Sequence, residues 1–218
     1  MNNSIYLRFL MTTSLLFFFF SNSSVAEDSG SFKRAGDWLV GAKIANLNPS
    51  VKSVVSIGGF VDADFDTFPL LDLRYFLSDH LAIEAIAGTT KHEVGVKGTE
   101  LGDVNLGSIK VLPPTITVQY HFDTGTNFLP YIGVGLNYTV FYDADAGEAA
   151  GITYSDEIGY AANVGFDFPL TEKTYLNLDV KKYRLSTNVK VDAGVNGSAL
   201  ADVDLDPLAI SIGYGWRF

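Results

Sequence analysis

Acidic and histidine side chains are the residues whose spacing in this sequence could bind a metal ion. Asp62-x-Asp64-x-Asp66 begins like a calcium loop, yet Thr67 replaces the glycine and Leu73 stands where the bidentate glutamate is needed. A second run, Asp202-x-Asp204-x-Asp206, meets Pro207 in the same way. A loosely held divalent cation is one interpretation of these runs. The missing ligands favour the other, solvated acidic loops, so no metal site is predicted.

The other residue types able to perform catalysis are scarce. The three histidines, His80, His92 and His121, fall in different parts of the strand pattern described below, so we do not expect them to share a metal or form a triad. There is no cysteine, which excludes a disulfide framework, a thiolate metal site and a cysteine nucleophile. The sequence predicts no catalytic residue and no cofactor.

Composition narrows the class of protein further. Of 218 residues, 47% are hydrophobic and 18% charged, with 25 acidic against 15 basic residues and a net charge of −10. This much apolar character excludes a disordered chain. The acidic balance argues against a nucleic-acid partner, which requires a cationic surface.

The N-terminus carries a targeting pattern. Arg8 precedes the apolar run Leu10–Phe20, and Ser24-Val25-Ala26 is a small-x-small pattern that a signal peptidase could cut. The pattern predicts a signal peptide over residues 1–26 and a single exported domain over residues 27–218. A membrane anchor helix is the alternative, although the apolar run is too short to span a bilayer.

Hydrophobic residues alternate with small or polar ones through most of the remaining chain. In 208–218, the residues Leu208, Ile210, Ile212, Tyr214, Trp216 and Phe218 share one face of a strand. The opposite face of that strand holds only small residues and Arg217. The same alternation predicts eight strands, within residues 38–44, 69–77, 81–87, 115–122, 128–142, 157–168, 176–181 and 208–218.

Two architectures would bury such strands. In a soluble sandwich the apolar faces would pack together, and the many glycines on the other faces would have no purpose. In a transmembrane barrel the apolar faces meet lipid, and the narrow lumen of eight strands admits only small residues and paired charges. We therefore predict an all-β, eight-stranded antiparallel transmembrane barrel.

The lengths of the links support the barrel. The links after the second, fourth and sixth strands are short, whereas the others are long, as expected for periplasmic turns and extracellular loops. The charged lumen-facing residues are predicted to form ion pairs that plug the periplasmic half, with an ion channel as the alternative. These residues are Asp72, Arg74, Glu84, Asp179, Lys181 and Arg217.

Several segments resemble one family. RAGDWLVGAK, LPPT at 112–115, QYHF, LPYIGVGLNYTVF and DPLAISIGYGWRF are similar to the OmpW family of small outer-membrane proteins, which includes alkane-uptake barrels. The resemblance implies passive uptake of small hydrophobic molecules across a Gram-negative outer membrane, with release sideways into the bilayer. Phe218, with Tyr214 and Trp216 at alternate positions, resembles the C-terminal signal read by the barrel-assembly machinery.

The sequence contains residues suited to such a route. Pro113 and Pro114 cannot donate to the ladder at the outer end of the fourth strand, which predicts a gap, a lateral gate, beside the third strand. Alternatively, the two prolines merely end a loop and start a strand. The loops would supply an apolar access surface or, as an alternative, a hydrophobic mini-core. The residues of this apolar access surface include Phe60, Phe65, Phe68, Leu106, Ile109 and Val111.

Two other functions remain open from the sequence. One is a structural or adhesive barrel that acts through its acidic extracellular loops. For a barrel of either function, outer-membrane lipid and lipopolysaccharide are the expected partners. The other is a lipid-modifying enzyme, which would need a histidine and a nucleophile clustered near the outer lumen, where only His92 is expected. We expect no enzyme.

Overall fold

The computed structural model describes residues 32–55, 58–99, 102–192, 194 and 197–218. The predicted signal peptide, residues 1–26, lies outside the described residues. Within the described part of the chain, there is no helix with the length and apolar character needed to cross a membrane.

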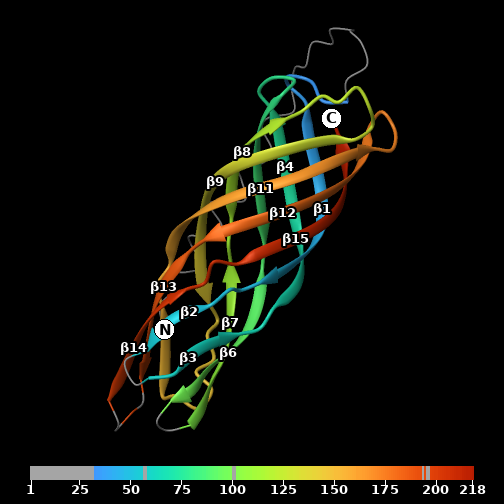
Figure 1. Cartoon of the computed structure of the whole chain (residues 1–218). Coiled ribbons are helices and arrows are strands. Elements are labelled where there is room, and N and C mark those ends of the chain that lie inside the picture. The colour runs from blue at the N-terminus through green and yellow to red at the C-terminus, as the bar shows by residue number, and fades with distance from the viewer. Residues whose placement is uncertain (1–31, 56–57, 100–101, 193, 195–196) are drawn as a thin grey trace, which may run out of the picture. The chain divides into compact units, whose positions relative to one another are not determined.

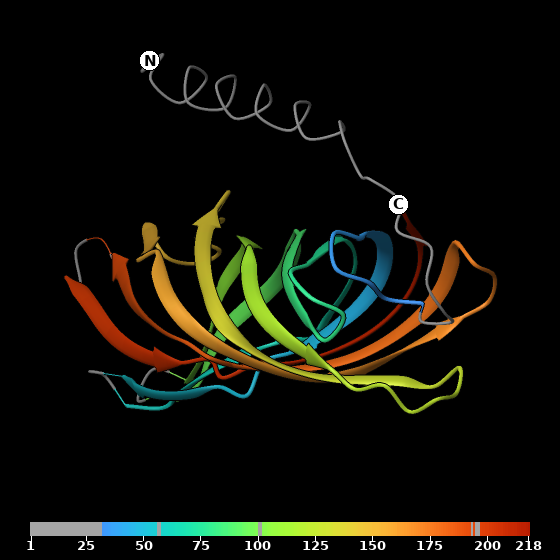
Figure 2. The same cartoon turned by 90° about the horizontal axis from the view of Figure 1, so that it is seen from above.

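A closed antiparallel barrel is formed by eight strands of the described chain (Figure 1). Their order is β11-β12-β15-β1-β4-β5-β8-β9, and pairing of β9 with β11 closes the wall. Seen from above, the strands curve around a common interior (Figure 2). The strands are β1 (Trp38–Asn48), β4 (Asp66–Phe76), β5 (Leu81–Gly88), β8 (Thr115–His121), β9 (Leu129–Tyr142), β11 (Glu157–Pro169), β12 (Thr174–Arg184) and β15 (Leu208–Arg217).

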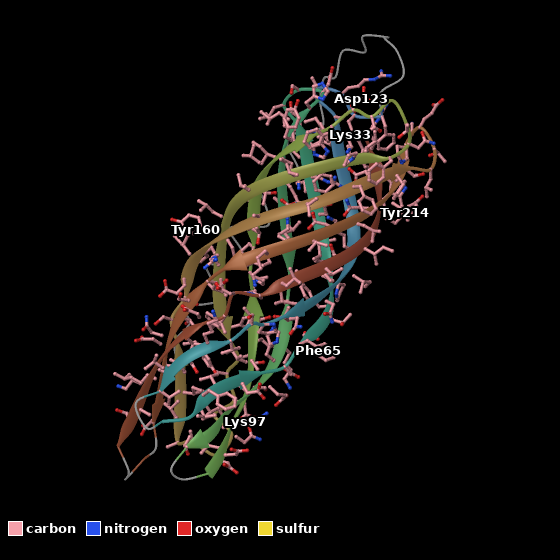
Figure 3. The ribbon with its side chains drawn as sticks, in the orientation of Figure 1. Lys33, Phe65, Lys97, Asp123, Tyr160 and Tyr214 are labelled. Carbon is pink, nitrogen blue, oxygen red and sulfur yellow. The ribbon has the colours of Figure 1, made fainter. Side chains whose placement is uncertain are left out.

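The predicted direction of the faces is confirmed in every barrel strand. In β15, Ile210 and Ile212 are more than half exposed on the outside, while Ser211 between them is buried. Closure satisfies the backbone hydrogen bonds within the wall, which a strand in lipid requires. The apolar residues thus form an outer surface rather than a core, as labelled Tyr160 and Tyr214 illustrate (Figure 3).

The lumen has room only for selected side chains. Tyr131 and Tyr175 point inward and are fully buried. A side chain at Gly165 would meet the Tyr131 hydroxyl, and one at Gly215 would meet the Tyr175 ring. These two glycines let large rings cross the interior of a narrow barrel, where a Cβ atom would collide with them.

Short turns lie at one end of the barrel, as predicted. They join β4 to β5, β8 to β9 and β11 to β12, and the C-terminus lies at the same end (Figure 1). Aromatic side chains pack together on the outer wall there, including Trp38 against Tyr75 at 4.7 Å and Tyr214 against Trp216 at 5.0 Å between ring centroids. Such a girdle is typical of the membrane interface, and short turns are typical of the periplasmic side.

The segments expected as long extracellular loops are largely strands. They extend the wall as two sheets, one in the order β10-β13-β14-β2 and one in the order β9-β7-β6-β3. The strands are β2 (Lys52–Val55), β3 (Phe60–Ala63), β6 (Thr90–Thr99), β7 (Gly102–Leu112), β10 (Gly151–Tyr154), β13 (Ser186–Asp192) and β14 (Ser198–Asp204). We call these seven strands the extracellular extension. They alternate with opposite polarity, apolar inward and charged outward, because their outer face meets water rather than lipid.

Candidate functional site

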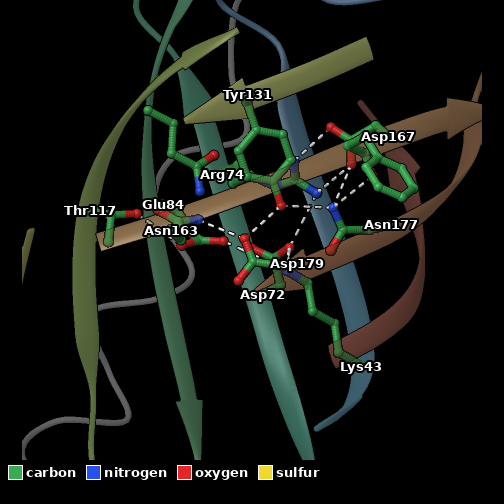
Figure 4. Close-up of polar contacts among 12 residues, drawn as sticks. Lys43, Asp72, Arg74, Glu84, Thr117, Tyr131, Asn163, Asp167, Asn177 and Asp179 are labelled. Atoms are coloured by element: carbon green, nitrogen blue, oxygen red, sulfur yellow. Dashed lines mark hydrogen bonds and ion pairs between the residues drawn. The ribbon is translucent and has the colours of Figure 1, made fainter. Parts of the chain in front are cut away.

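A charged network fills the lumen of the barrel. In the described chain it contains four cations and four carboxylates, so its charges balance. Arg74 is at its centre, fully buried, and donates two hydrogen bonds to Asp167, at 2.8 and 3.2 Å (Figure 4). Its guanidinium is also 3.2 Å from Asp72 and lies over the rings of Tyr131 and Tyr175.

The remaining ion pairs extend the network across the lumen. Lys43 pairs with Asp72 at 2.9 Å. Lys181 donates to Glu84 at 2.7 Å and lies 3.7 Å from Asp179. Each charged group of the network faces an opposite charge, which offsets part of the cost of burying it. The network is therefore a plug of cross-linked side chains.

A residue that precedes the first strand completes the plug. Lys33 is buried and reaches Asp167 at 2.7 Å, and it donates to Nδ1 of His121 at 2.8 Å. Nε2 of His121 lies 3.1 Å from the side-chain oxygen of Gln119. The segment before β1 thereby closes the periplasmic end of the lumen.

Above the plug, the extracellular extension encloses an apolar cavity of about 270 Å³. Its wall includes the buried cluster Val61, Val94, Val96, Leu106, Ile109, Val111, Val189, Ala201 and Val203. Of its lining side chains in the described residues, only His92 and Glu148 belong to types that carry charge near neutral pH. Such a cavity suits uncharged, largely apolar molecules.

The barrel wall is interrupted beside this cavity. Between the pairs Ile86↔Thr115 and Thr90↔Val111, no backbone pair joins the described residues 87–89 to 112–114. The register is the same on both sides, so Gly88 and Pro113 would be partners if the ladder continued. Pro113 has no amide hydrogen to donate to Gly88, which accounts for the interruption, while Pro114 faces β9 and accepts from the Tyr138 amide. We call this break the proline seam.

Asn137 on β9 holds the proline seam from the inside. Its side-chain amide donates to the carbonyl oxygens of Pro113 at 3.1 Å and Pro114 at 3.2 Å, and to the Thr115 hydroxyl at 3.0 Å. Pro113 lines the apolar cavity and also a smaller pocket toward the plug, which Ala87 and Gly88 line as well. The seam therefore lies where the cavity approaches the lipid-facing wall.

Comparison with known proteins places this arrangement in a family. A model of the OmpW family matches residues 34–218. Outer membrane protein W of Vibrio cholerae is 35% identical over 194 residues, which cover 84% of this chain and 89% of that protein. The chain belongs to the OmpW family. The resemblance predicted from its segments is confirmed.

Other relatives of this OmpW-family protein agree. Outer membrane protein AlkL of Ectopseudomonas oleovorans is 27% identical over 199 residues, covering 84% of this chain and 83% of that protein. The dibenzothiophene metabolism operon protein PahQ of Pseudomonas aeruginosa is 30% identical over 164 residues, covering 74% and 76%. The crystal structure of the outer membrane protein OprG from Pseudomonas aeruginosa superposes with a TM-score of 0.80 at 31% identity, covering 87% of this chain and 99% of that one. The protein is an outer-membrane barrel of a Gram-negative bacterium.

The predicted lumen residues of this OmpW-family barrel divide into two groups. Asp72, Arg74, Glu84, Asp179 and Lys181 lie together in the plug. Arg217 does not join them. It is the last residue of β15, at the periplasmic rim, where its guanidinium is 3.7 Å from the Asp37 carboxylate and donates to the Phe32 carbonyl.

Three plug residues were not predicted as ion-pair partners. Lys43 and Asp167 belong to the inward faces of β1 and β11, so the alternation contained a signal for both. Lys33 lies before the first strand, where no alternation exists, and no local pattern indicates that it enters the lumen.

The predicted access surface is also divided by the structure. Leu106, Ile109 and Val111 line the apolar cavity, and Phe68 is buried deeper, in the smaller pocket near the seam. Phe60 and Phe65 face outward, 54% and 64% exposed, and do not line the cavity. Phe60 lies on the outward face of β3, where neighbouring residues face opposite sides, and Phe65 lies between β3 and β4.

The histidines are separated, with His80 in a periplasmic turn, His121 in the plug and His92 beside the cavity. Within the described residues, no three histidine or acidic side chains are grouped to hold a metal ion. His92 is held by Asp64 and Thr90, at 2.8 Å from the Asp64 carbonyl and 3.0 Å from the Thr90 hydroxyl.

Proposed function

We propose that this protein is a passive conduit for small hydrophobic molecules, which occupy the apolar cavity from outside and leave through the proline seam into the bilayer. The observation that supports this most is the position of the cavity, between the extracellular surface and the seam. Burial of apolar surface favours occupancy by about 25 cal/mol per Å². A molecule in the cavity borders the outer wall at Pro113.

The plug supports a sideways rather than a straight route. Passage through the lumen would require separating buried pairs such as Arg74–Asp167 and Lys181–Glu84. Leaving buried charges without partners is costly, and a hydrophobic molecule offers no replacement for them. Lateral exit at the seam breaks none of these pairs.

Relatives support the choice of cargo. The name of PahQ links that relative to dibenzothiophene metabolism, and dibenzothiophene is an apolar aromatic compound. The OmpW family, by the resemblance described above, includes alkane-uptake barrels. A cavity lined by valine, leucine, isoleucine and alanine fits cargo of this chemistry.

Closing the proline seam is expected to slow uptake. In the double variant Pro113→Val, Pro114→Val, the restored amide hydrogen of residue 113 can bond to Gly88, since the register is already continuous. The amide of residue 114 faces Tyr138 on β9. One added hydrogen bond of about 0.5–1.5 kcal/mol would reduce seam opening by about twofold to tenfold. Uptake of n-nonane by intact cells that express the variant measures this.

The matched control is Pro130→Val, because Pro130 lies near the start of β9, beside the short turn from β8 and away from the seam. Heat-modifiable migration in gels verifies that both variants are folded. Unchanged n-nonane uptake in a folded double variant would contradict lateral release. Uptake that does not require the protein at all would instead favour a structural or adhesive barrel.

The exposed C-terminal aromatic face is proposed to be recognised during assembly by the barrel-assembly machinery. We expect Phe218→Ala to lower the amount of folded protein in the outer membrane severalfold. Its backbone hydrogen bonds with Trp38 are unaffected by the change, so refolding of the purified protein should be normal. Phe122→Ala, which removes another exposed aromatic, is the control. Equal loss in cells and in refolding would contradict recognition.

Lipopolysaccharide is proposed as the lipid partner near the outer ends of the strands. Arg184, at the outer end of β12, is 79% exposed on the lipid side of the wall. A long cationic side chain at this position can extend to anionic headgroups.

A further inference from the structure

The apolar cavity contains one polar group that the fold does not use. The hydroxyl of Tyr154, on β10, is buried and has no hydrogen-bond partner. Among the side chains that line the cavity in the described residues, it is the one buried polar atom without a hydrogen-bond partner. A buried hydroxyl without a partner is unusual, and each such group requires an explanation.

The other polar groups around the cavity have partners within the protein. Thr187 donates to the Ser155 carbonyl at 2.9 Å, and Thr139 donates to Asn137 at 2.5 Å. Glu148 accepts from the Asn105 amide at 3.3 Å. These groups are therefore engaged in holding the strands together, whereas the Tyr154 hydroxyl is not.

The position of Tyr154 is fixed by packing. Its ring stacks on Phe141, with centroids 5.4 Å apart and planes inclined by 18°. The backbone of β10 pairs with β13 in a register that places Tyr154 opposite Val189, another cavity residue. Burial raises the pKa of Tyr154 to about 12, so the phenol keeps its proton at neutral pH. It is a neutral donor held in one place.

We propose that Tyr154 selects hydrophobic cargo that carries one neutral hydrogen-bond acceptor, such as a ketone or ester oxygen. This inference rests on the proposed function and specifies its substrate class. The apolar wall binds the hydrocarbon part, and the Tyr154 hydroxyl donates to the oxygen. An unsubstituted alkane of the same length fills the same volume but leaves the hydroxyl without a partner.

The same surroundings disfavour charged cargo. The cavity wall in the described residues contains no lysine or arginine, so a carboxylate would be desolvated there without a countercharge. Its volume of about 270 Å³ is close to the lower end of the range of ligand pockets, which indicates small molecules. A neutral, medium-length oxygenated hydrocarbon meets both conditions.

Paired probes test the proposal, namely n-nonane and 2-nonanone, which differ by one carbonyl oxygen. We expect Tyr154→Phe to lower protein-dependent uptake of 2-nonanone by about threefold to tenfold, the effect of one hydrogen bond. Uptake of n-nonane should be unchanged, because the aromatic ring and its packing remain. Tyr160→Phe is the matched control, since Tyr160 is 70% exposed on the outer wall; it should change the uptake of neither probe.

The outcomes separate this proposal from the one on which it rests. Protein-dependent uptake of both probes, with no change in Tyr154→Phe, would reject the hydrogen bond and leave the conduit in place. Equal loss for both probes would show a packing role only. If neither probe requires the protein, the proposed function fails and this inference with it.

A direct measurement supplements uptake. In lipid bilayers containing the folded protein, the carbonyl ¹³C resonance of labelled 2-nonanone should show a second, hydrogen-bonded signal. That signal should disappear in Tyr154→Phe and persist in Tyr160→Phe. A signal that persists in Tyr154→Phe would overturn the proposal.

Discussion

Replacing Ala201 by tryptophan is expected to reduce protein-dependent uptake of hydrophobic probes to background. Ala201 lies on β14, is buried, and lines the apolar cavity. Because the cavity holds about 270 Å³, an indole ring directed inward removes much of the space available to cargo. The expected loss is larger than that for the seam variant, since no cargo reaches the seam. Uptake of n-nonane by intact cells measures it.

Size dependence distinguishes blocking from general damage. Ala201→Leu should give partial loss, in proportion to the volume that it fills. Ala144→Trp adds the same ring at an exposed position between β9 and β10 and should leave uptake unchanged. Overpacking costs about 1–3 kcal/mol, so the thermal midpoint of each folded variant is compared as well. Full uptake in a folded Ala201→Trp protein would contradict the cavity route.

The membrane-spanning wall could be predicted from sequence because one simple rule applies to it. In β5, Leu81 and Ile83 face lipid while Glu84 faces the lumen, and period two records this directly. Every barrel strand contains such a pattern, so their number, the closure and the short turns follow.

The extracellular extension was harder to predict for a physical reason. Odd-numbered residues point outward in both β5 and β6. In β5 they are apolar, as in Leu81 and Ile83, whereas in β6 they are charged, as in Lys91 and Glu93. The inward residues become apolar instead, as in Val94 and Val96. The solvent outside the wall changes from lipid to water near Gly88, and the polarity reverses with it. A sequence pattern that requires an apolar outward face in every strand therefore assigns these strands to loops.

The candidate site could be predicted only where it depends on single residues. The two prolines indicate a gap by their chemistry alone. The Asn137 contacts, the unpartnered Tyr154 hydroxyl and the insertion of Lys33 depend on which distant segments meet across the barrel. No local pattern contains that information.

The second large effect concerns the plug. Arg74→Met is expected to lower the free energy of unfolding by about 3–5 kcal/mol, the usual cost of removing one partner from buried charges. Asp167 and Asp72 would remain buried, with Lys33 and Lys43 respectively as their remaining cations. Urea unfolding of the protein in lipid vesicles measures this. The matched control is Lys97→Met, which breaks an exposed pair with Asp62 and should leave the free energy of unfolding nearly unchanged.

Charge balance explains why a second change should partly rescue the first. In Arg74→Met, Asp167→Asn the excess carboxylate charge is removed, and the stability should return part of the way to that of the wild-type protein. Arg74→Met should also raise single-channel conductance through the loosened lumen, while n-nonane uptake, which bypasses the plug, should stay unchanged. A parallel rise in uptake would show that cargo passes through the plug, and the lateral route would be wrong.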